Sequence, residues 1–120
     1  MEKFGITAMG LSKDVKASMG YVGEIQGNLS RFLLTDGEVM WYCRLKRRFR
    51  RPKFAVVWVS PNGQIFKQDY FQNVWEDHEF AKTTLKLDPQ RPDIFLGRWR
   101  VTIYEKKELV DDRFFEVVSA

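Results

Sequence analysis

Cysteine and histidine each occur only once in this chain of 120 residues. A single cysteine excludes an internal disulfide framework and any metal site built from several cysteines, and a single histidine excludes sites that need several imidazoles. The sequence also lacks a glycine-rich phosphate loop, a paired His–Glu helix motif and a serine elbow. It therefore identifies no catalytic residue, no metal ligand and no cofactor, and we expect a protein that is not an enzyme.

Long hydrophobic runs are missing as well. The longest apolar runs, such as residues 55–59, fall far short of the roughly 20 residues that cross a bilayer. Residues 1–11 are interrupted by Glu2, Lys3 and Gly5, so they do not resemble a secretory signal. We therefore expect a soluble chain with no membrane span. The cytoplasm is the default location, and the cell envelope is the alternative if a leader has been removed.

Apolar and aromatic residues, by contrast, are plentiful. Hydrophobic residues make up 44% of the chain and aromatic residues 15%, beside 30% charged residues, a balance that argues against disorder and low complexity. A chain of this length can bury a core without disulfides or metals. The length suits one domain, which we expect to cover residues 1–120.

Short β-branched and aromatic runs between turn residues predict that strands dominate. Residues 39–46 alternate, with Tyr42, Arg44 and Lys46 on the polar face of a half-buried strand. The other face is apolar and is expected to face a core; it consists of Val39, Trp41, Cys43 and Leu45. Because apolar surroundings raise the pKa of a thiol and suppress its chemistry, we interpret Cys43 as a core residue.

Two hairpins are predicted. In the first, the apolar run at residues 54–59 enters a Ser-Pro-Asn-Gly turn at residues 60–63, and this turn chemistry is typical of a closing turn. In the second, residues 98–103 alternate between polar and apolar, a charged tip follows at residues 105–108, and a Phe-x-Val strand returns from Phe115. The strands of the second hairpin are expected to be wet on one face.

Residues 69–86 are ambiguous. Their apolar positions fall close to helical spacing, yet residues 82–87 alternate as a strand. We expect a loop or one helical turn first and a strand afterwards, and the choice between helix and strand stays open. Residues 88–93 contain two prolines, which predicts a loop.

Several strands, two hairpins and no pattern of helical crossovers predict an all-β fold, an antiparallel sandwich or barrel. The most specific pattern is a glycine-aromatic-valine strand at residues 97–104, followed by a tip at residues 106–109 and by Phe115-Glu116-Val117. This pattern resembles the closing hairpin of the immunoglobulin-like sandwich modules found in bacterial envelope and secreted proteins.

The resemblance extends upstream. Residues 6–15 resemble the opening strand of these modules, and residues 56–63 resemble their strand that ends in a Pro-x-Gly turn. A second similar block is formed by Phe32, Asp36 and Val39. The resemblance implies a single antiparallel immunoglobulin-like β-sandwich and an accessory or interaction role, but a fold does not assign a site.

One segment, residues 44–53, concentrates positive charge. It contains seven basic residues and no acid, whereas the rest of the chain holds 13 basic and 16 acidic residues. If the flanking strands pair, these cations crowd the end of a hairpin, where they would attract phosphates or an acidic partner. The alternative is a solvated turn that keeps a strand edge from pairing. The candidate anion- or partner-binding residues are Arg44, Lys46, Arg47, Arg48, Phe49, Arg50, Arg51 and Lys53.

Aromatic residues form the second candidate. We expect Trp41, Trp58 and Trp99 to fill the interior of a sandwich about 10 Å thick. Other aromatic residues have less certain directions and could form an exposed platform that stacks on sugar rings or fills the pockets of a partner. This possible platform consists of Tyr42, Tyr70, Phe71 and Trp75.

Glu76-Asp77-His78-Glu79 is the place where the histidine meets carboxylates. Adjacent residues cannot all face one ion in a strand or helix, so we interpret these residues as a wet acidic loop and not as a metal site. The sequence thus favours a non-catalytic binding or accessory module that contacts another protein or a second copy of itself. The alternatives are nucleic acid, held electrostatically by residues 44–53, and carbohydrate, held by exposed aromatic residues.

Overall fold

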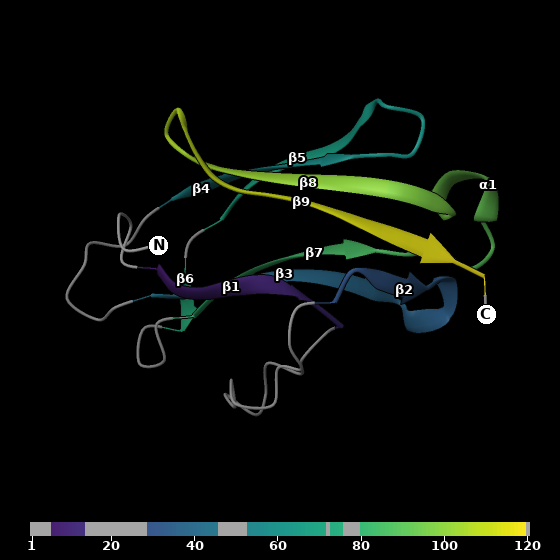
Figure 1. The fold of residues 1–120 in the computed structure, drawn as a ribbon, viewed down its shortest axis with the longest axis horizontal. Coiled ribbons are helices and arrows are strands. Elements are labelled where there is room, and N and C mark those ends of the chain that lie inside the picture. The colour runs from purple at the N-terminus through teal and green to yellow at the C-terminus, as the bar shows by residue number, and fades with distance from the viewer. Residues whose placement is uncertain (1–5, 14–28, 46–52, 72, 76–79, 120) are drawn as a thin grey trace.

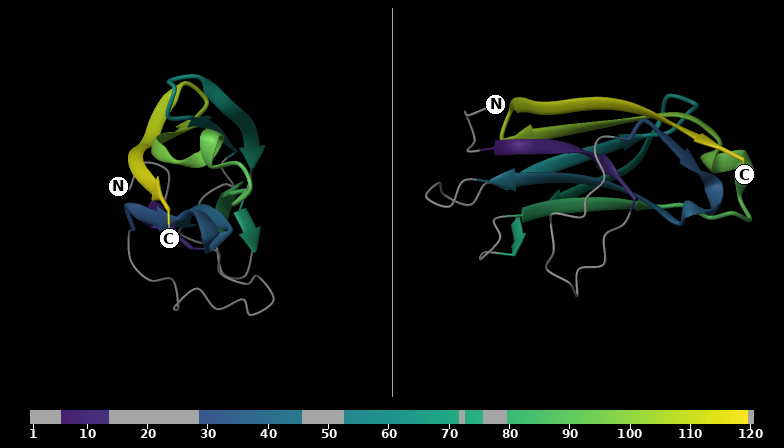
Figure 2. Two further views of the ribbon diagram at one scale, coloured as in Figure 1. Left: turned by 90° about the vertical axis from the view of Figure 1, so that its right-hand side faces the viewer. Right: turned by 60° about the horizontal axis from the view of Figure 1, so that its bottom comes forward.

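Two β-sheets lie face to face in the structure of this chain (Figure 1). The computed structural model describes residues 6–13, 29–45, 53–71, 73–75 and 80–119. The four-stranded sheet contains β1 (Ile6–Ser12), β3 (Glu38–Leu45), β7 (Phe80–Lys86) and β6 (Asn73–Trp75), in that order. The five-stranded sheet contains β2 (Arg31–Leu33), β9 (Glu108–Val118), β8 (Gly97–Glu105), β4 (Phe54–Val59) and β5 (Ile65–Phe71). The predicted all-β sandwich is confirmed, and Figure 2 shows its two layers from the end and from below.

The strands run antiparallel to their neighbours except at β2, which lies parallel to β9. Parallel neighbours need a long connection, and more than seventy residues separate these two strands along the chain. The prediction of an antiparallel sandwich therefore holds for every described pair but this short one.

Both predicted hairpins are confirmed. β4 and β5 are joined by the turn at residues 60–63, where Gly63 adopts a φ of +86° that favours glycine. β8 and β9 pair along their whole length, from Gly97 opposite Val117 to Glu105 opposite Glu108. A Cβ atom on Gly97 would lie 2.8 Å from the Cβ of Pro61, so glycine lets the first turn approach the start of β8.

The ambiguous stretch is now resolved in part. The expected later strand is confirmed as β7, in which Thr83 and Leu85 are buried, and Leu87 just after it is buried too. The expected loop or helical turn is wrong for residues 69–71, which continue β5 because they pair with residues 54–56 of β4. Residues 76–79, including the acidic histidine segment, lie outside the described residues.

The predicted loop at residues 88–93 is also partly wrong. Its last two residues begin a four-residue helix, α1 (Pro92–Phe95). Proline suits the first position of a helix because its missing N–H would have no partner there. This helix leads directly into β8 and carries the buried side chain of Phe95. No helix in the described ranges is long and apolar enough to cross a bilayer.

β3 is covered on both faces, although its sequence predicts a half-buried strand. Trp41 and Cys43 face the core as expected, but Tyr42 on the opposite face is only 8% exposed. Tyr42 lies between Gly10 of β1 and Lys82 of β7, neighbours that flank it from both sides. Met40 on the same face is buried as well, and alternation within one strand encodes neither burial.

Aromatic residues fill the space between the sheets. Trp41, Trp58 and Trp99 are fully buried, which confirms their predicted place. The ring of Phe115 on β9 lies 6.1 Å from that of Trp58, 6.3 Å from that of Trp99 and 5.6 Å from that of Phe32 on β2. Each such buried side chain contributes about 1.5–3 kcal/mol, so these rings stabilise the side of the core that the five-stranded sheet supplies.

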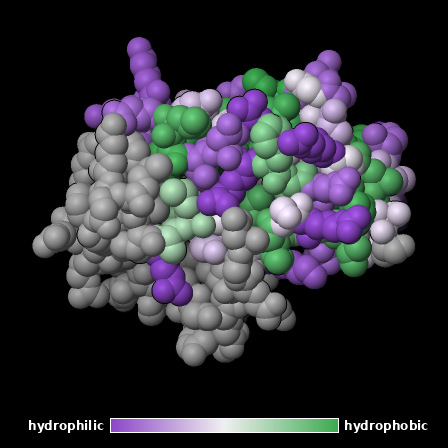
Figure 3. Space-filling model, viewed as in Figure 1, coloured by the Kyte–Doolittle hydropathy of each residue, from purple (hydrophilic) through white to green (hydrophobic). Residues whose placement is uncertain are grey.

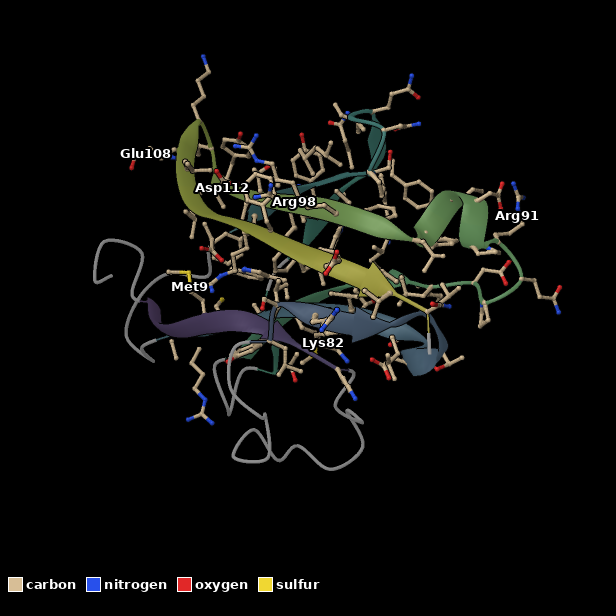
Figure 4. The ribbon with its side chains drawn as sticks, turned by 45° about the vertical axis from the view of Figure 1, so that its right-hand side comes forward. Met9, Lys82, Arg91, Arg98, Glu108 and Asp112 are labelled. Carbon is tan, nitrogen blue, oxygen red and sulfur yellow. The ribbon has the colours of Figure 1, made fainter. Side chains whose placement is uncertain are left out.

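A polar bridge joins the two sheets where β1 lies below β9, as Figure 4 shows at Met9. The indole N–H of Trp41 on β3 donates to Oδ2 of Asp111 on β9 over 2.6 Å. The guanidinium of Arg113 donates to the same carboxylate and, over 3.4 Å, to the main-chain oxygen of Met9. The Asp111 carboxylate therefore accepts hydrogen bonds from side chains of both sheets, Trp41 of the four-stranded sheet and Arg113 of the five-stranded sheet.

Replacing Asp111 with alanine should destabilise the fold by about 1–3 kcal/mol, because the buried indole N–H of Trp41 loses its acceptor. Chemical denaturation followed by tryptophan fluorescence would measure the loss. Asp112→Ala is the matched control, since Asp112 forms an exposed ion pair with Arg100 and its removal should change the free energy of unfolding little. Equal losses in the two variants would refute the bridge.

Cys43 should resist thiol reagents in the folded protein. Burial raises the pKa of the Cys43 thiol well above its ordinary value, and the thiolate is the form that reacts. At pH 8 we expect labelling at least about a hundredfold slower in buffer than in urea, where the side chain is exposed. Rapid labelling of the native chain, monitored by mass spectrometry, would show that Cys43 is not enclosed.

Candidate functional site

The basic segment at residues 44–53 connects the two sheets. Arg44 is exposed near the end of β3, and Lys53 is exposed just before β4. Because β3 and β4 belong to different sheets, the flanking strands do not pair, and the condition for cations crowded at the end of a hairpin is not met. The remaining predicted residues, Lys46, Arg47, Arg48, Phe49, Arg50 and Arg51, lie outside the described residues.

Lys53 lies beside an exposed aromatic ring. Its main-chain N–H donates to Oε2 of Glu105 over 3.2 Å, which holds the residue at the start of β4. Its Nζ atom is 5.3 Å from the ring centroid of Tyr70, whose side chain is 69% exposed. A lysine within about 6 Å of an aromatic face is attracted by the ring, so these two side chains form a cation–π pair.

The four aromatic residues of the predicted platform do not share one surface. Tyr42 is buried on the four-stranded sheet, so its inclusion is wrong. Phe71 is half-buried and packs against Phe54 at 5.3 Å and Trp41 at 5.8 Å, which makes it part of the core edge. Tyr70 is exposed as the platform requires. The side chain of Trp75 lies outside the described residues.

The structure reveals an exposed aromatic residue that the sequence analysis missed. Phe114 on β9 is 46% exposed, and the guanidinium carbon of Arg98 lies 4.1 Å from its ring centroid. Arg100 approaches the same ring at 5.3 Å. The missing signal was alternation on the returning strand: Phe115 faces the core, so Phe114 faces outward beside the two arginines of β8.

Arg100 is held in place by Asp112. Its Nε and Nη2 atoms each donate to a different oxygen of that carboxylate over 2.8 Å. These bonds lower the pKa of Asp112, so the acid stays ionised and the guanidinium stays oriented. Figure 4 shows Arg98 and Asp112 on the side of β8 and β9 that points away from the other sheet.

An apolar strip runs between the two aromatic–cation groups. Ala55, Val57 and Val59 of β4 face outward and are half-buried. Tyr70 of β5 lies opposite Ala55 on one side, and Arg100 of β8 lies opposite Val59 on the other. We call this surface the outer face; it consists of Lys53, Ala55, Val57, Val59, Tyr70, Arg98, Arg100 and Phe114. Figure 3 shows the adjoining β9 side, where hydrophilic and hydrophobic residues intermingle.

The outer face carries excess positive charge. Lys53, Arg98 and Arg100 lie on it, and the acids beside them are already paired. Asp112 binds Arg100, and Glu116 lies 3.9 Å from Arg31. The face can therefore accept an apolar surface that also carries carboxylates.

An open hollow of about 580 Å³ lies between the β4–β5 turn and α1, with Phe66 and Ile94 among its lining residues. Several of its polar groups are already used, because Asn62 accepts hydrogen bonds from the Ser60 hydroxyl and the Gln64 N–H, and Asp93 accepts from Arg91. We therefore interpret the hollow as a consequence of the turn's shape and not as a candidate binding site. Within the described ranges, no three His, Cys, Asp or Glu side chains gather as metal ligands would.

The comparisons with known proteins concern the fold. No family model and no curated protein matches this sequence. Among solved structures, an immunoglobulin-like protein from Pseudomonas aeruginosa is similar, with a TM-score of 0.58, 11% sequence identity and 92% of each chain covered. At this identity the similarity carries the fold alone. It agrees with the two-sheet topology, and the chain is an all-β protein with an immunoglobulin-like sandwich fold.

Proposed function

We propose that this chain is a non-catalytic binding module that contacts another protein through the outer face. The observation that supports this most is the pairing of exposed aromatic rings with cations, Tyr70 with Lys53 and Phe114 with Arg98, beside the apolar strip of β4. Aromatic residues and arginine are enriched at the centres of protein interfaces. The preferred partner is a protein segment with apolar side chains and carboxylates.

The aromatic rings and the cations of the outer face would make different contributions to binding a protein, and both support the proposal. The rings of Tyr70 and Phe114 supply area that a partner can bury, and they lose little conformational freedom on binding. Arg100 is preorganised by Asp112, so a partner does not have to order it. The cations favour acidic partners and increase the rate of encounter.

We also propose the kind of protein to which this module belongs. The resemblance of the closing hairpin to accessory modules of bacterial envelope and secreted proteins, and the immunoglobulin-like protein of Pseudomonas aeruginosa, both support an accessory domain of a bacterial protein. In this proposal the cytoplasm stays the default location, and the cell envelope is the alternative.

The outer face can be tested with a library of short random peptides selected against the immobilised protein. We expect the selected peptides to combine acidic and aromatic residues and to bind Phe114→Ala at least about tenfold more weakly, because a central anchor is lost. Phe114 is exposed, so this variant should fold normally.

Leu109→Ala is the matched control for this experiment, because Leu109 is an exposed apolar residue at the tip of the β8–β9 hairpin, outside the outer face. Its affinity for the selected peptides should equal that of the unmodified protein. Selected peptides that bind Phe114→Ala as tightly as the control, or a selection that enriches nothing, would argue against the proposal.

Nucleic acid is the second candidate ligand, and the place of Lys53 favours it. This residue ends the basic segment and lies over the exposed ring of Tyr70, so a phosphate contact and a stacking surface adjoin each other. Proteins that hold single strands combine these two elements. Arginine, which predominates in residues 44–53, suits both phosphate contact and stacking.

Retention on single-stranded DNA or RNA at low salt would test this second candidate. Electrostatic binding predicts that the logarithm of affinity falls with the logarithm of salt concentration by about 0.7 for each phosphate contact. Reversing Arg47, Arg48, Arg50 and Arg51 to glutamate should abolish retention, while Lys86→Glu on β7 should not. Binding that ignores salt, or that survives the fourfold reversal, would eliminate this candidate.

A further inference from the structure

β5 is the edge strand of the five-stranded sheet, and it is unusually exposed. In the described part of the chain it pairs with β4 and with no strand on its other side. Ile65 is 57% exposed, Phe66 43% and Tyr70 69%. A long edge strand with apolar side chains is a template for pairing with another chain. This edge therefore offers both main-chain hydrogen bonds and apolar area to a partner.

The main chain of β5 directs alternate amides toward the free edge. The N–H of Tyr70 donates to its neighbour, the Asp69 carboxylate, over 3.0 Å, which places that amide on the side away from β4. In an antiparallel ladder, residues two apart point their amides the same way. The amide of Gln68 therefore faces the free edge as well.

Two charged residues of β5, Lys67 and Asp69, oppose unwanted pairing at this edge. Lys67 lies opposite Trp58 and Asp69 lies opposite Val56, and both of these β4 residues face the core. Lys67 and Asp69 therefore sit on the inner side of the strand, where Nζ of Lys67 donates to the Thr84 carbonyl over 3.2 Å. On the same side Nζ of Lys67 lies 3.7 Å from Oδ2 of Asp69, so the two charges form an ion pair within the strand. Inward-pointing charges are a common device against unwanted pairing, because an unrelated strand offers no charges that match them.

The sequence of β5 is complementary to itself about Gln68. The strand is Ile65-Phe66-Lys67-Gln68-Asp69-Tyr70-Phe71, with a cation before the glutamine and an anion after it. In an antiparallel pair of two identical strands centred on Gln68, each Lys67 lies opposite Asp69 of the other copy and on the same face. One position further out, Phe66 lies opposite Tyr70 at the register irregularity of β5, where the Phe66 ring turns inward against Phe95 and Trp99.

We propose that β5 pairs with β5 of a second copy of this chain, antiparallel and in the register that sets Gln68 opposite Gln68. The two five-stranded sheets then form one continuous sheet across a two-fold axis. In this register the amides of Gln68 and Tyr70 gain main-chain partners, and each Lys67–Asp69 ion pair gains a second set of opposite charges from the other copy. A shift by two residues sets Lys67 opposite Lys67 or Asp69 opposite Asp69. Because like charges opposite each other are destabilising, these two residues favour the register centred on Gln68.

This inference goes beyond the proposed function and does not rest on it. Lys67 and Asp69 face inward, whereas the outer face lies on the opposite side of the sheet. Changes at Lys67 and Asp69 therefore leave Phe114 and its arginines in place. A chain that stays monomeric would overturn the pairing and leave the peptide selection at the outer face unaffected.

Charge reversal tests the pairing by sedimentation velocity over a range of concentrations. The unmodified protein should shift from 14.2 kDa toward twice that mass as concentration rises. Lys67→Asp and Asp69→Lys should each weaken the dimer at least about tenfold, because each sets two like charges opposite each other. The double variant Lys67→Asp/Asp69→Lys restores both pairs and should recover the dimer.

Lys86→Asp is the matched control for the charge reversals, since Lys86 is exposed on β7 in the other sheet. Its dimer should equal that of the unmodified protein. A chain that stays at 14.2 kDa at every concentration, or a dimer that both single reversals leave intact, overturns the proposal.

A cysteine at the two-fold axis provides a second test, one that does not depend on charge. Directly opposite Cα atoms in a strand pair lie about 5.5 Å apart, within reach of a disulfide. Because Cys43 is buried, Gln68→Cys adds the one accessible thiol among the described residues. Mild oxidation should convert Gln68→Cys into a covalent dimer and leave Lys86→Cys monomeric. Equal crosslinking of the two variants, or none in Gln68→Cys, contradicts the register.

Discussion

The packing of Phe115 against Trp58, Trp99 and Phe32 is the contact on which the rest of the structure depends. These rings can contact one another only if each of their strands turns the face that carries the ring toward the core. Asp111 adds a directional constraint, because its carboxylate accepts from Trp41 of the other sheet. Once the inner side of each strand is fixed in this way, the identity of every outward residue is fixed too.

The properties of the surface follow from that constraint. With Phe115 inward, Phe114 must lie outward, where Arg98 and Arg100 of the neighbouring strand flank its ring. Tyr70 is forced outward in the same way beside Lys53. Both groups lie on the five-stranded sheet, whose last strand, β5, ends in a free edge in the described part of the chain. The surfaces on which both proposals rest therefore lie on one sheet.

Local features could be predicted from the sequence, and features that depend on distant pairing could not. The turn at residues 60–63 and the inward tryptophans follow from turn chemistry and alternation, and both were predicted correctly. The burial of Tyr42 on the outer side of its sheet is not encoded in the alternation of β3, and the bond from Trp41 to Asp111 joins residues 70 positions apart. At the candidate site, Tyr70 was predicted, but the arginines beside Phe114 required the register of β8 and β9.

The central claim is that the free edge of β5 is a surface for contact with a second copy, and amide hydrogen exchange measures this most directly. In dilute protein the amides of Gln68 and Tyr70 should exchange quickly, and in concentrated protein they should become protected. The amides of β8, which lies between two strands, should be protected throughout. Exchange at Gln68 and Tyr70 that is equally fast at every concentration would contradict the account.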